Sequence, residues 1–153
     1  FIPVPVIITI IIAAIGIFVL SQTKFGRYLY ALGGNEESAK LSGINTDKIK
    51  MMTYVVSGFV SAIAGVIITS RIGSASPNAG TGFELDAIAA VVIGGTSLAG
   101  GEGKISGTIV GALIIGVLNN GLNLMNVSPF YQSIVKGLVI LIAVLLDKKS
   151  RNK

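Results

Sequence analysis

The feature that most constrains this chain is the distribution of its charges. Three long stretches, residues 51–70, 87–101 and 105–135, contain no Asp, Glu, Lys or Arg. About 20 apolar residues in a helix that rises 1.5 Å per residue cross the ~30 Å hydrocarbon core of a bilayer. Charged residues make up 12% of the 153 residues, against roughly 25% in an average soluble domain. The sequence therefore predicts an all-α, polytopic membrane protein with a helical bundle.

Five apolar segments are expected to cross the membrane. The predicted spans are residues 3–20, 51–70, 86–101, 105–124 and 130–146, and residues 21–50 form a cytoplasmic loop. The chain enters its first apolar run at once and without Met, and its first basic residues, Lys24 and Arg27, follow that run. A signal peptide would carry basic residues before the run. We therefore interpret residues 1–153 as the C-terminal part of one longer transmembrane domain.

Basic residues predict the orientation, because they are enriched in cytoplasmic loops. With residues 21–50 inside, ten of the 12 Lys and Arg residues are cytoplasmic, Arg71 is outside, and Lys136 lies within the last span. Phe1 is then extracytoplasmic. The positions expected in the cytoplasm are Gly34, Glu102 and Lys153.

The third apolar segment is short for a membrane crossing. Residues 87–101 as a helix would reach only ~22 Å. A re-entrant loop here would put the basic C-terminal tail outside, against the charge rule. The pair Gly94–Gly95 instead predicts that the segment crosses as a short or interrupted helix.

Several kinds of chemistry are excluded or disfavoured by composition and motif. The chain has no Cys and no His, so we expect no thiolate metal site, no catalytic residue and no cofactor. The glycine-rich segment 94–107 lacks the Ser or Thr that must follow the lysine of a phosphate-binding loop, since Ile105 follows Lys104. The pI near 9.6 reflects basic residues that flank apolar spans, which indicates membrane lipid and no nucleic acid as the partner.

Small residues recur at four-residue spacing in two of the predicted spans. They are Ser57, Ser61 and Gly65 in one, and Gly107 and Gly111 in the other. Small residues on one helix face let membrane helices approach closely. Packing within the chain is favoured over a dimer contact.

Polar side chains within the last two spans are candidates for a translocation pathway: Asn119, Asn120, Asn123 and Lys136. Buried amides are costly unless paired, so these asparagines either bond neighbouring helices or line a polar path for a neutral polyol. Lys136 is either a functional intramembrane residue or a lysine that extends to the outer interface. Asp86, at the start of the third span, is expected to cap its helix.

The segment from Gly34 to Gly43 predicts a short cytoplasmic helix, Glu36 to Leu41, between glycines. Its pattern Glu37-Ser-Ala39, three residues, then Gly43 resembles the EAA loop of ABC importer permeases. Two departures are Ser38, where the family often has Ala, and Thr53, where Ile would be expected. The resemblance implies a coupling helix that docks on an ATPase subunit. The residues it implies for this contact are Glu36, Glu37, Ala39 and Gly43.

The resemblance extends to the flanking sequence. The phrases FGRYLYALGGNEESAKLSGINTDKIK, GTGFELDAIAAVVIGGTSLAGG and GVLNNGLNLMNVSPFYQSIVKGLVILIAVLLD are similar to those of permease subunits of ribose-type carbohydrate ABC importers. This similarity covers essentially residues 1–147. It implies a roughly ten-helix permease of the bacterial cytoplasmic (inner) membrane that is not itself an enzyme. The implied partners are an ABC ATPase subunit, a periplasmic or lipoprotein sugar-binding protein and a second permease copy.

Two other classes of protein fit the sequence less well. An ion-coupled secondary sugar transporter would place acids inside its spans, whereas all seven acidic residues here lie at or beyond the span ends. An intramembrane hydrolase would need a nucleophile beside a base, and without His or Cys only a Ser–Lys arrangement is left.

Overall fold

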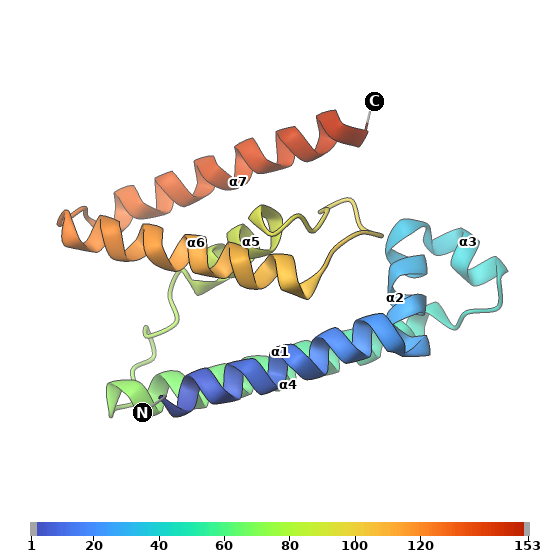
Figure 1. Ribbon diagram of the computed structural model, residues 1–153, viewed down its shortest axis with the longest axis horizontal. Coiled ribbons are helices and arrows are strands. Elements are labelled where there is room, and N and C mark those ends of the chain that lie inside the picture. Colours follow the sequence, from blue (N-terminus) through green and yellow to red (C-terminus); the bar gives the residue numbers. More distant parts are fainter. Residues whose placement is uncertain (1–2, 152–153) are drawn as a thin grey trace. The chain divides into compact units, whose positions relative to one another are not determined.

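The computed structural model describes residues 3–151, with side chains described up to residue 145. Every regular element in that part of the chain is an α-helix, as predicted (Figure 1). The chain divides into two units, Phe1–Thr81 and Gly82–Lys153. Phe1 and Lys153, which the sequence predicts on opposite sides of the membrane, lie outside the described residues.

The first unit contains four helices, α1 to α4. Their bounds are α1 Val4–Gln22, α2 Lys24–Gly34, α3 Glu36–Leu41 and α4 Thr46–Ile72. Thr23 separates α1 from α2, and its Oγ1 accepts a hydrogen bond from the N–H of Gly26 at 3.3 Å. Gly26 lies so close to the backbone of Leu20 that a Cβ atom would collide with it. A glycine is therefore needed where α2 turns back against the end of α1.

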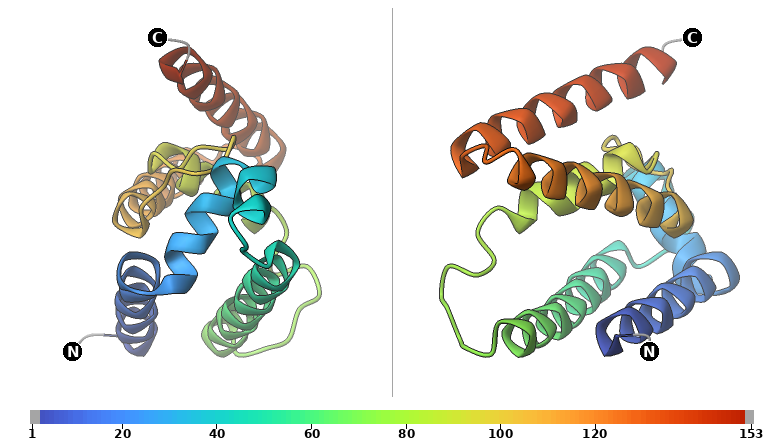
Figure 2. Two further views of the ribbon diagram at one scale, coloured as in Figure 1. Left: turned by 90° about the vertical axis from the view of Figure 1, so that its right-hand side faces the viewer. Right: turned by 60° about the vertical axis from the view of Figure 1, so that its left-hand side comes forward.

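The second unit contains three helices: α5 Phe83–Ile93, α6 Ile105–Leu124 and α7 Pro129–Arg151. The short helix α5 packs against both α6 and α7, and α6 and α7 run in opposite directions on either side of a tight turn (Figure 2). The core of this unit comprises Ala89, Ala90 and Ile115, with Ile93 and Ile140 packed against them. The packing centre of the unit is thus formed around α5.

Glycines allow α5 and α6 to approach closely. A Cβ atom on Gly107 would collide with the backbone of Gly94, and one on Gly111 would collide with the carbonyl oxygen of Ala90. The prediction that Gly107 and Gly111 serve packing within the chain is confirmed. Gly65, by contrast, has open space around its Cα, and the Ser57–Ser61–Gly65 face of α4 is exposed.

The observed helices correct the predicted boundaries. The segment 21–50, predicted as a loop with one short helix, also contains the whole of α2 and the start of α4. Asn45 explains the early start of α4, because its Oδ1 accepts a hydrogen bond from the N–H of Lys48 at 3.0 Å. Within the predicted span 86–101, the structure has the short helix α5, which begins earlier, at Phe83, and ends at Ile93, just before the Gly94–Gly95 pair where the sequence predicts an interruption. Gly95 has a φ of +82°, which an L side chain rarely adopts.

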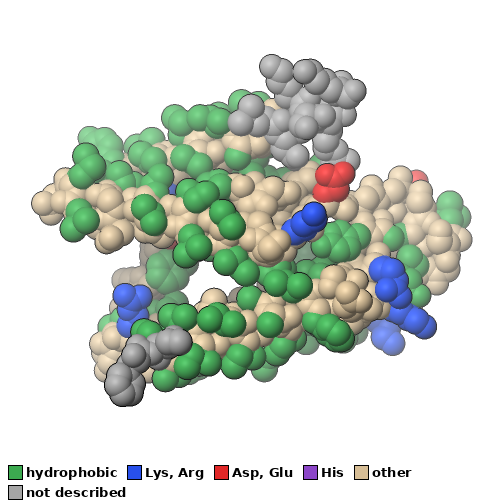
Figure 3. All heavy atoms as spheres, viewed as in Figure 1, with side chains coloured by type: hydrophobic (Ala, Val, Ile, Leu, Met, Phe, Trp, Pro, Cys, Tyr) green, Lys and Arg blue, Asp and Glu red, His purple; other side chains and the backbone are tan. Residues whose placement is uncertain are grey.

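Three helices, α1, α4 and α6, are long and apolar enough to cross a membrane, and α7 has a shorter apolar part, Pro129–Leu145. Large hydrophobic side chains lie exposed along these helices (Figure 3). In a soluble protein such apolar surfaces would be covered. Their exposure along whole helices is what a lipid environment requires.

Candidate functional site

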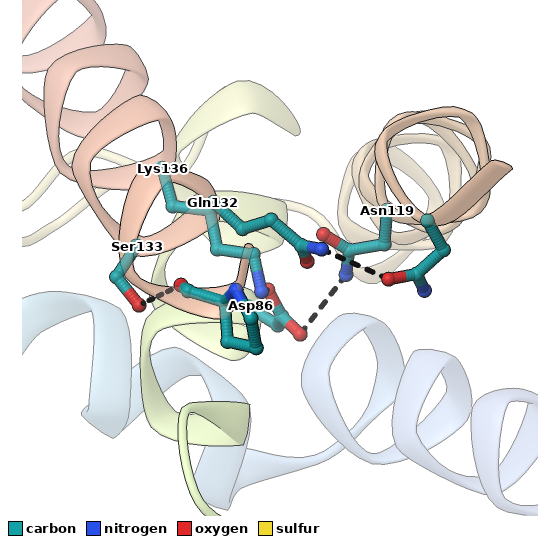
Figure 4. Close-up of polar contacts among 7 residues, drawn as sticks. Asp86, Asn119, Gln132, Ser133 and Lys136 are labelled. Atoms are coloured by element: carbon teal, nitrogen blue, oxygen red, sulfur yellow. Dashed lines mark hydrogen bonds and ion pairs between the residues drawn. The ribbon is translucent and has the colours of Figure 1, made fainter. Parts of the chain in front are cut away.

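A group of polar side chains joins α5, α6 and α7 within an otherwise apolar unit. The Nζ atom of Lys136 on α7 lies 2.6 Å from Oδ1 of Asp86 on α5. The second carboxylate oxygen of Asp86 accepts a hydrogen bond from Nδ2 of Asn119 on α6 at 3.1 Å (Figure 4). The side chains of Lys136 and Asp86 are only 12% and 22% exposed. A single carboxylate therefore connects all three helices of the unit, and we call Asp86, Asn119 and Lys136 the polar cluster.

The role predicted for Asp86 as a helix cap is wrong. The residue at the N-cap position of α5 is Gly82, with a φ of +87°, and no side chain caps the helix. Because α5 begins at Phe83, Asp86 lies inside its first turn, where its negative charge still interacts favourably with the helix dipole. Its side chain is thereby free to point to the neighbouring helices.

The structure gives each of two predicted pathway asparagines a partner on another helix. Asn119 bonds Asp86, and the Oδ1 atom of Asn123 accepts a hydrogen bond from Nε2 of Gln132 on α7 at 2.9 Å. Gln132 also donates to the carbonyl of Val127 in the turn between α6 and α7, at 2.9 Å. The third asparagine, Asn120, is exposed. Asn119 and Asn123 thus bond neighbouring helices, and Lys136 points to Asp86 in this structure (Figure 4).

A groove of about 360 Å³ adjoins the polar cluster between α5 and α6. The residues that line it are Phe83, Asp86, Ala87, Ala90, Ala112, Ile115, Gly116 and Asn119. Half of them are Ala or Gly, and larger side chains at those positions on α5 and α6 would fill the space. Asn119 Oδ1 is buried and has no hydrogen-bond partner among the described residues.

The predicted short helix is present as α3, with the predicted bounds. Asn35 caps it, since its Oδ1 accepts a hydrogen bond from the N–H of Ser38 at 2.9 Å. Ala39 is 4% exposed and anchors α3 to the rest of the first unit. Gly43 ends the helix region with a φ of +82°, a conformation that favours glycine.

The four residues expected to contact an ATPase therefore differ in whether their side chains are exposed. Glu37 is exposed, whereas Ala39 faces the protein. Glu36 is exposed but also pairs with Lys50 of α4, at 2.5 Å between Oε1 and Nζ. The side chain of Leu41 is 89% exposed beside them, an apolar surface that sequence reasoning missed.

Asp86 and Gln132 were also missed as members of a site. One signal was available: Asp86 and Lys136 are opposite charges that border the charge-free stretches 87–101 and 105–135, and a charge among apolar residues needs a partner. For Gln132 the sequence offers no comparable signal. Within residues 3–145, no group of three or more His, Cys, Asp or Glu side chains is arranged to hold a metal ion.

Comparisons with known proteins agree with the resemblance found in the sequence. The chain is 60% identical over 146 residues to the ribose import permease protein of Haemophilus influenzae, which covers 95% of this chain and 45% of that protein. It is 60% identical over 148 residues to the ribose import permease protein of Bacillus subtilis, covering 97% of this chain and 46% of that protein. No solved structure matches the chain.

A xylose transport system permease protein of Haemophilus influenzae is 49% identical over 152 residues, covering 99% of this chain and 40% of that protein. The chain thus spans under half the length of the curated relatives it matches. These relatives are transport permeases, and together with the apolar helices they identify a multi-pass membrane protein. The sequence pattern of one protein family matches residues 1–144, so the chain belongs to the family described as branched-chain amino acid transport system / permease component.

Proposed function

We propose that this chain forms part of the permease subunit of an ATP-driven ABC importer for ribose or a related monosaccharide. The identity of 60% to ribose permeases, against 49% to a xylose permease, supports a pentose and favours ribose. The observation that carries the coupling role is α3, a six-residue helix that is anchored on one side and open on the other. The permease moves the sugar, and a separate ATPase subunit hydrolyses ATP.

In this proposal α3 is the coupling helix. Ala39 holds α3 against the first unit, and the exposed ion pair of Glu36 with Lys50 is a further contact of α3 with the start of α4. Glu37 and Leu41 are the exposed groups that an ATPase groove would contact. Gly43 supplies the turn that returns the chain to α4. Movement of the ATPase would thus be transmitted through α3 to a helix long enough to cross the membrane.

The proposed assembly has further members. A periplasmic or lipoprotein sugar-binding protein delivers the sugar, a second permease copy completes the translocation unit, and lipid of the bacterial cytoplasmic membrane surrounds it. We further propose that the chain crosses five times with a cytoplasmic C-terminus. The antiparallel packing of α5 on α6 supports a crossing at α5, because Asp86 contacts Asn119 near one end of α6 and Gly94 contacts Gly107 near the other.

The proposed translocation pathway includes Asn119, Asn120, Asn123 and Lys136. Amides donate and accept hydrogen bonds without a net charge, which suits an uncharged sugar. The half-buried polar cluster beside the groove supports this role for Asn119 and Lys136. The exposed side chain of Asn120 supports a role at the surface of a pathway.

The coupling role is tested by charge reversal in the full-length permease produced with its ATPase partner. Glu37→Lys and Gly43→Asp are expected to reduce co-purification of the ATPase while membrane insertion is kept. Glu102→Lys is the matched control, because it reverses an exposed acidic residue of the loop between α5 and α6. Wild-type recovery of the ATPase with both α3 variants would contradict the coupling role.

The energy source of uptake distinguishes the proposed ABC importer from the alternative, an ion-coupled secondary sugar transporter. Ribose uptake into proteoliposomes that contain permease, ATPase and sugar-binding protein is expected to require ATP on the side of the membrane where the ATPase lies. Uptake driven by a proton or sodium gradient without ATP would favour the alternative.

A further inference from the structure

We propose that the α5–α6 groove binds the transported sugar, with Asp86 and Asn119 contacting its hydroxyl groups and Phe83 covering its apolar face. The inference rests on the proposed function and names its substrate site. It adds Asp86 and Phe83 to the residues of the pathway. It also assigns Lys136 a positioning role in place of direct contact with the sugar.

The size and lining of the groove fit a small polyol. Its volume of about 360 Å³ lies within the range of roughly 300–1,000 Å³ that is usual for small-molecule sites. Such sites are mostly apolar and contain a few polar groups that fix the orientation of the ligand. Here the apolar walls come from Ala87, Ala90 and Ala112, and the polar groups are Asp86 and Asn119.

The two polar side chains have hydrogen-bonding capacity left over. Asn119 Nδ2 carries two N–H groups and donates one to Asp86 Oδ2, which in turn has a second lone pair. A free donor and a free acceptor therefore lie 3.1 Å apart. A sugar hydroxyl both donates and accepts, so one hydroxyl, or two on neighbouring carbons, matches this pair. The unpartnered Asn119 Oδ1 is a further acceptor on the same side chain.

The charge of the site also fits an uncharged ligand. A lone carboxylate among apolar residues would attract a cation and would be costly to bury. The Nζ atom of Lys136, 2.6 Å from Asp86 Oδ1, neutralises that charge from the side of α7. Lys136 does not line the groove, so it holds the carboxylate in place and leaves the Oδ2 side to the sugar.

Phe83 supplies the apolar contact. It lines the groove, and 47% of its surface is exposed. The C–H face of a sugar ring is apolar and lies well against an aromatic ring, while hydroxyls at the ring edge bond polar groups. Phe83 and Asp86 are three residues apart on one helix, so their side chains lie on the same face.

Exchanging the two charges tests whether Asp86 binds the sugar or only forms an ion pair between α5 and α7. The double variant Asp86→Lys with Lys136→Asp keeps an ion pair between α5 and α7 but removes the carboxylate from the groove. In the full-length permease with its ATPase and sugar-binding protein, ATP-dependent ribose uptake should fall at least about tenfold, as expected for the loss of a charge-assisted hydrogen bond. Thermal stability should be close to that of the wild type. Recovery of uptake to within about twofold of the wild type would overturn the proposal.

A neutral pair serves if the exchanged variant does not fold. Asp86→Asn with Lys136→Gln removes both charges and keeps polar side chains of similar size. The same roughly tenfold loss at unchanged stability supports the proposal, and near-normal uptake overturns it. Glu84→Gln is the control, since Glu84 is an exposed acidic residue on the same helix and does not line the groove.

Labelling provides a test that leaves the charges intact. In a permease without other cysteines, ribose should protect Ala87→Cys in the groove from a thiol reagent. It should not protect Ser76→Cys, an exposed position in the loop between α4 and α5 and outside the groove. Equal labelling of Ala87→Cys with and without saturating ribose would overturn the proposal. If the wild-type assembly itself shows no ATP-dependent ribose uptake, the proposed function fails instead.

Discussion

Lys136 on α7 and Asp86 on α5 form an ion pair of 2.6 Å between Nζ and Oδ1 within the apolar second unit. The two residues come from different predicted spans, and their helices contact each other directly. A charge in an apolar environment is costly when it is alone and tolerable when it is paired and hydrogen-bonded. The pair is therefore one of the contacts that hold α5 on α7, together with the apolar packing of Ile140.

Removing one partner of this pair should cost more stability than removing both. Lys136→Met leaves Asp86 with only the bond from Asn119, and we expect the free energy of unfolding to fall by roughly 3 kcal/mol. The double variant Lys136→Met with Asp86→Leu should lose clearly less, since no charge is left without a partner. Thermal unfolding of the purified full-length permease measures both. Equal losses in the single and double variants would contradict a paired, half-buried charge.

Close packing of α5 on α6 should depend on Gly111. In Gly111→Ala the added Cβ atom meets the carbonyl oxygen of Ala90, and the helices must separate. We expect a loss of about 1–3 kcal/mol, as for other overpacked positions. Gly121→Ala on the same helix is the matched control, because nothing lies within 4 Å of the added atom. Similar stability of the two variants in the same unfolding assay would show that the close approach is unimportant.

The turn after α3 should require Gly43 for its backbone conformation. Its φ of +82° favours glycine, and no atom lies within 4 Å of an added Cβ. Gly43→Ala should therefore lower stability by about 1 kcal/mol through strain alone. Gly43→Asn, whose side chain tolerates a positive φ better, should lose less. If the Ala variant is as stable as the wild type, backbone strain is not what the glycine relieves.

Accessibility of the loop between α5 and α6 should decide whether the third apolar segment crosses. If the chain crosses the membrane at α5, the cysteine introduced by Glu102→Cys is cytoplasmic. An impermeant thiol reagent should then not label it in intact cells. Ser76→Cys, in the loop between α4 and α5, should be labelled and serves as the control. Labelling of both from outside would indicate a re-entrant segment.

Substituting each partner of the Asn123–Gln132 hydrogen bond in turn distinguishes a role of Asn123 in transport from its structural role. Asn123→Leu removes the 2.9 Å bond between α6 and α7 and should cost about 1 kcal/mol of stability, whereas Gln132→Leu also removes the bond to the Val127 carbonyl and should cost about 2 kcal/mol. If Asn123 also lines the pathway, Asn123→Leu should reduce ribose uptake further than Gln132→Leu does. If uptake by Asn123→Leu is no lower than uptake by Gln132→Leu, the Asn123 amide is purely structural.

The sequence by itself determined which segments are apolar and, from that, the fold class of the protein. Charge-free runs such as residues 51–70 already require an all-α membrane protein, because an apolar helix satisfies its own backbone hydrogen bonds in lipid. The short helix Glu36–Leu41 was predictable with its bounds, since Asn35 and Gly43 are local signals that act over one turn. The family was equally readable from contiguous residues.

Only the tertiary structure decided which residues of different segments meet. The sequence around Asp86 predicts a local role as a helix cap, which is wrong, and nothing within α5 reveals that Lys136 and Asn119 each contact one oxygen of its carboxylate. The Gly94–Gly95 pair is a local signal for the end of α5, but only the packing places Gly94 against the backbone of Gly107. Whether a segment forms an apolar helix depends on its own residues. The partner of a buried polar group depends instead on how helices that are distant in sequence pack together.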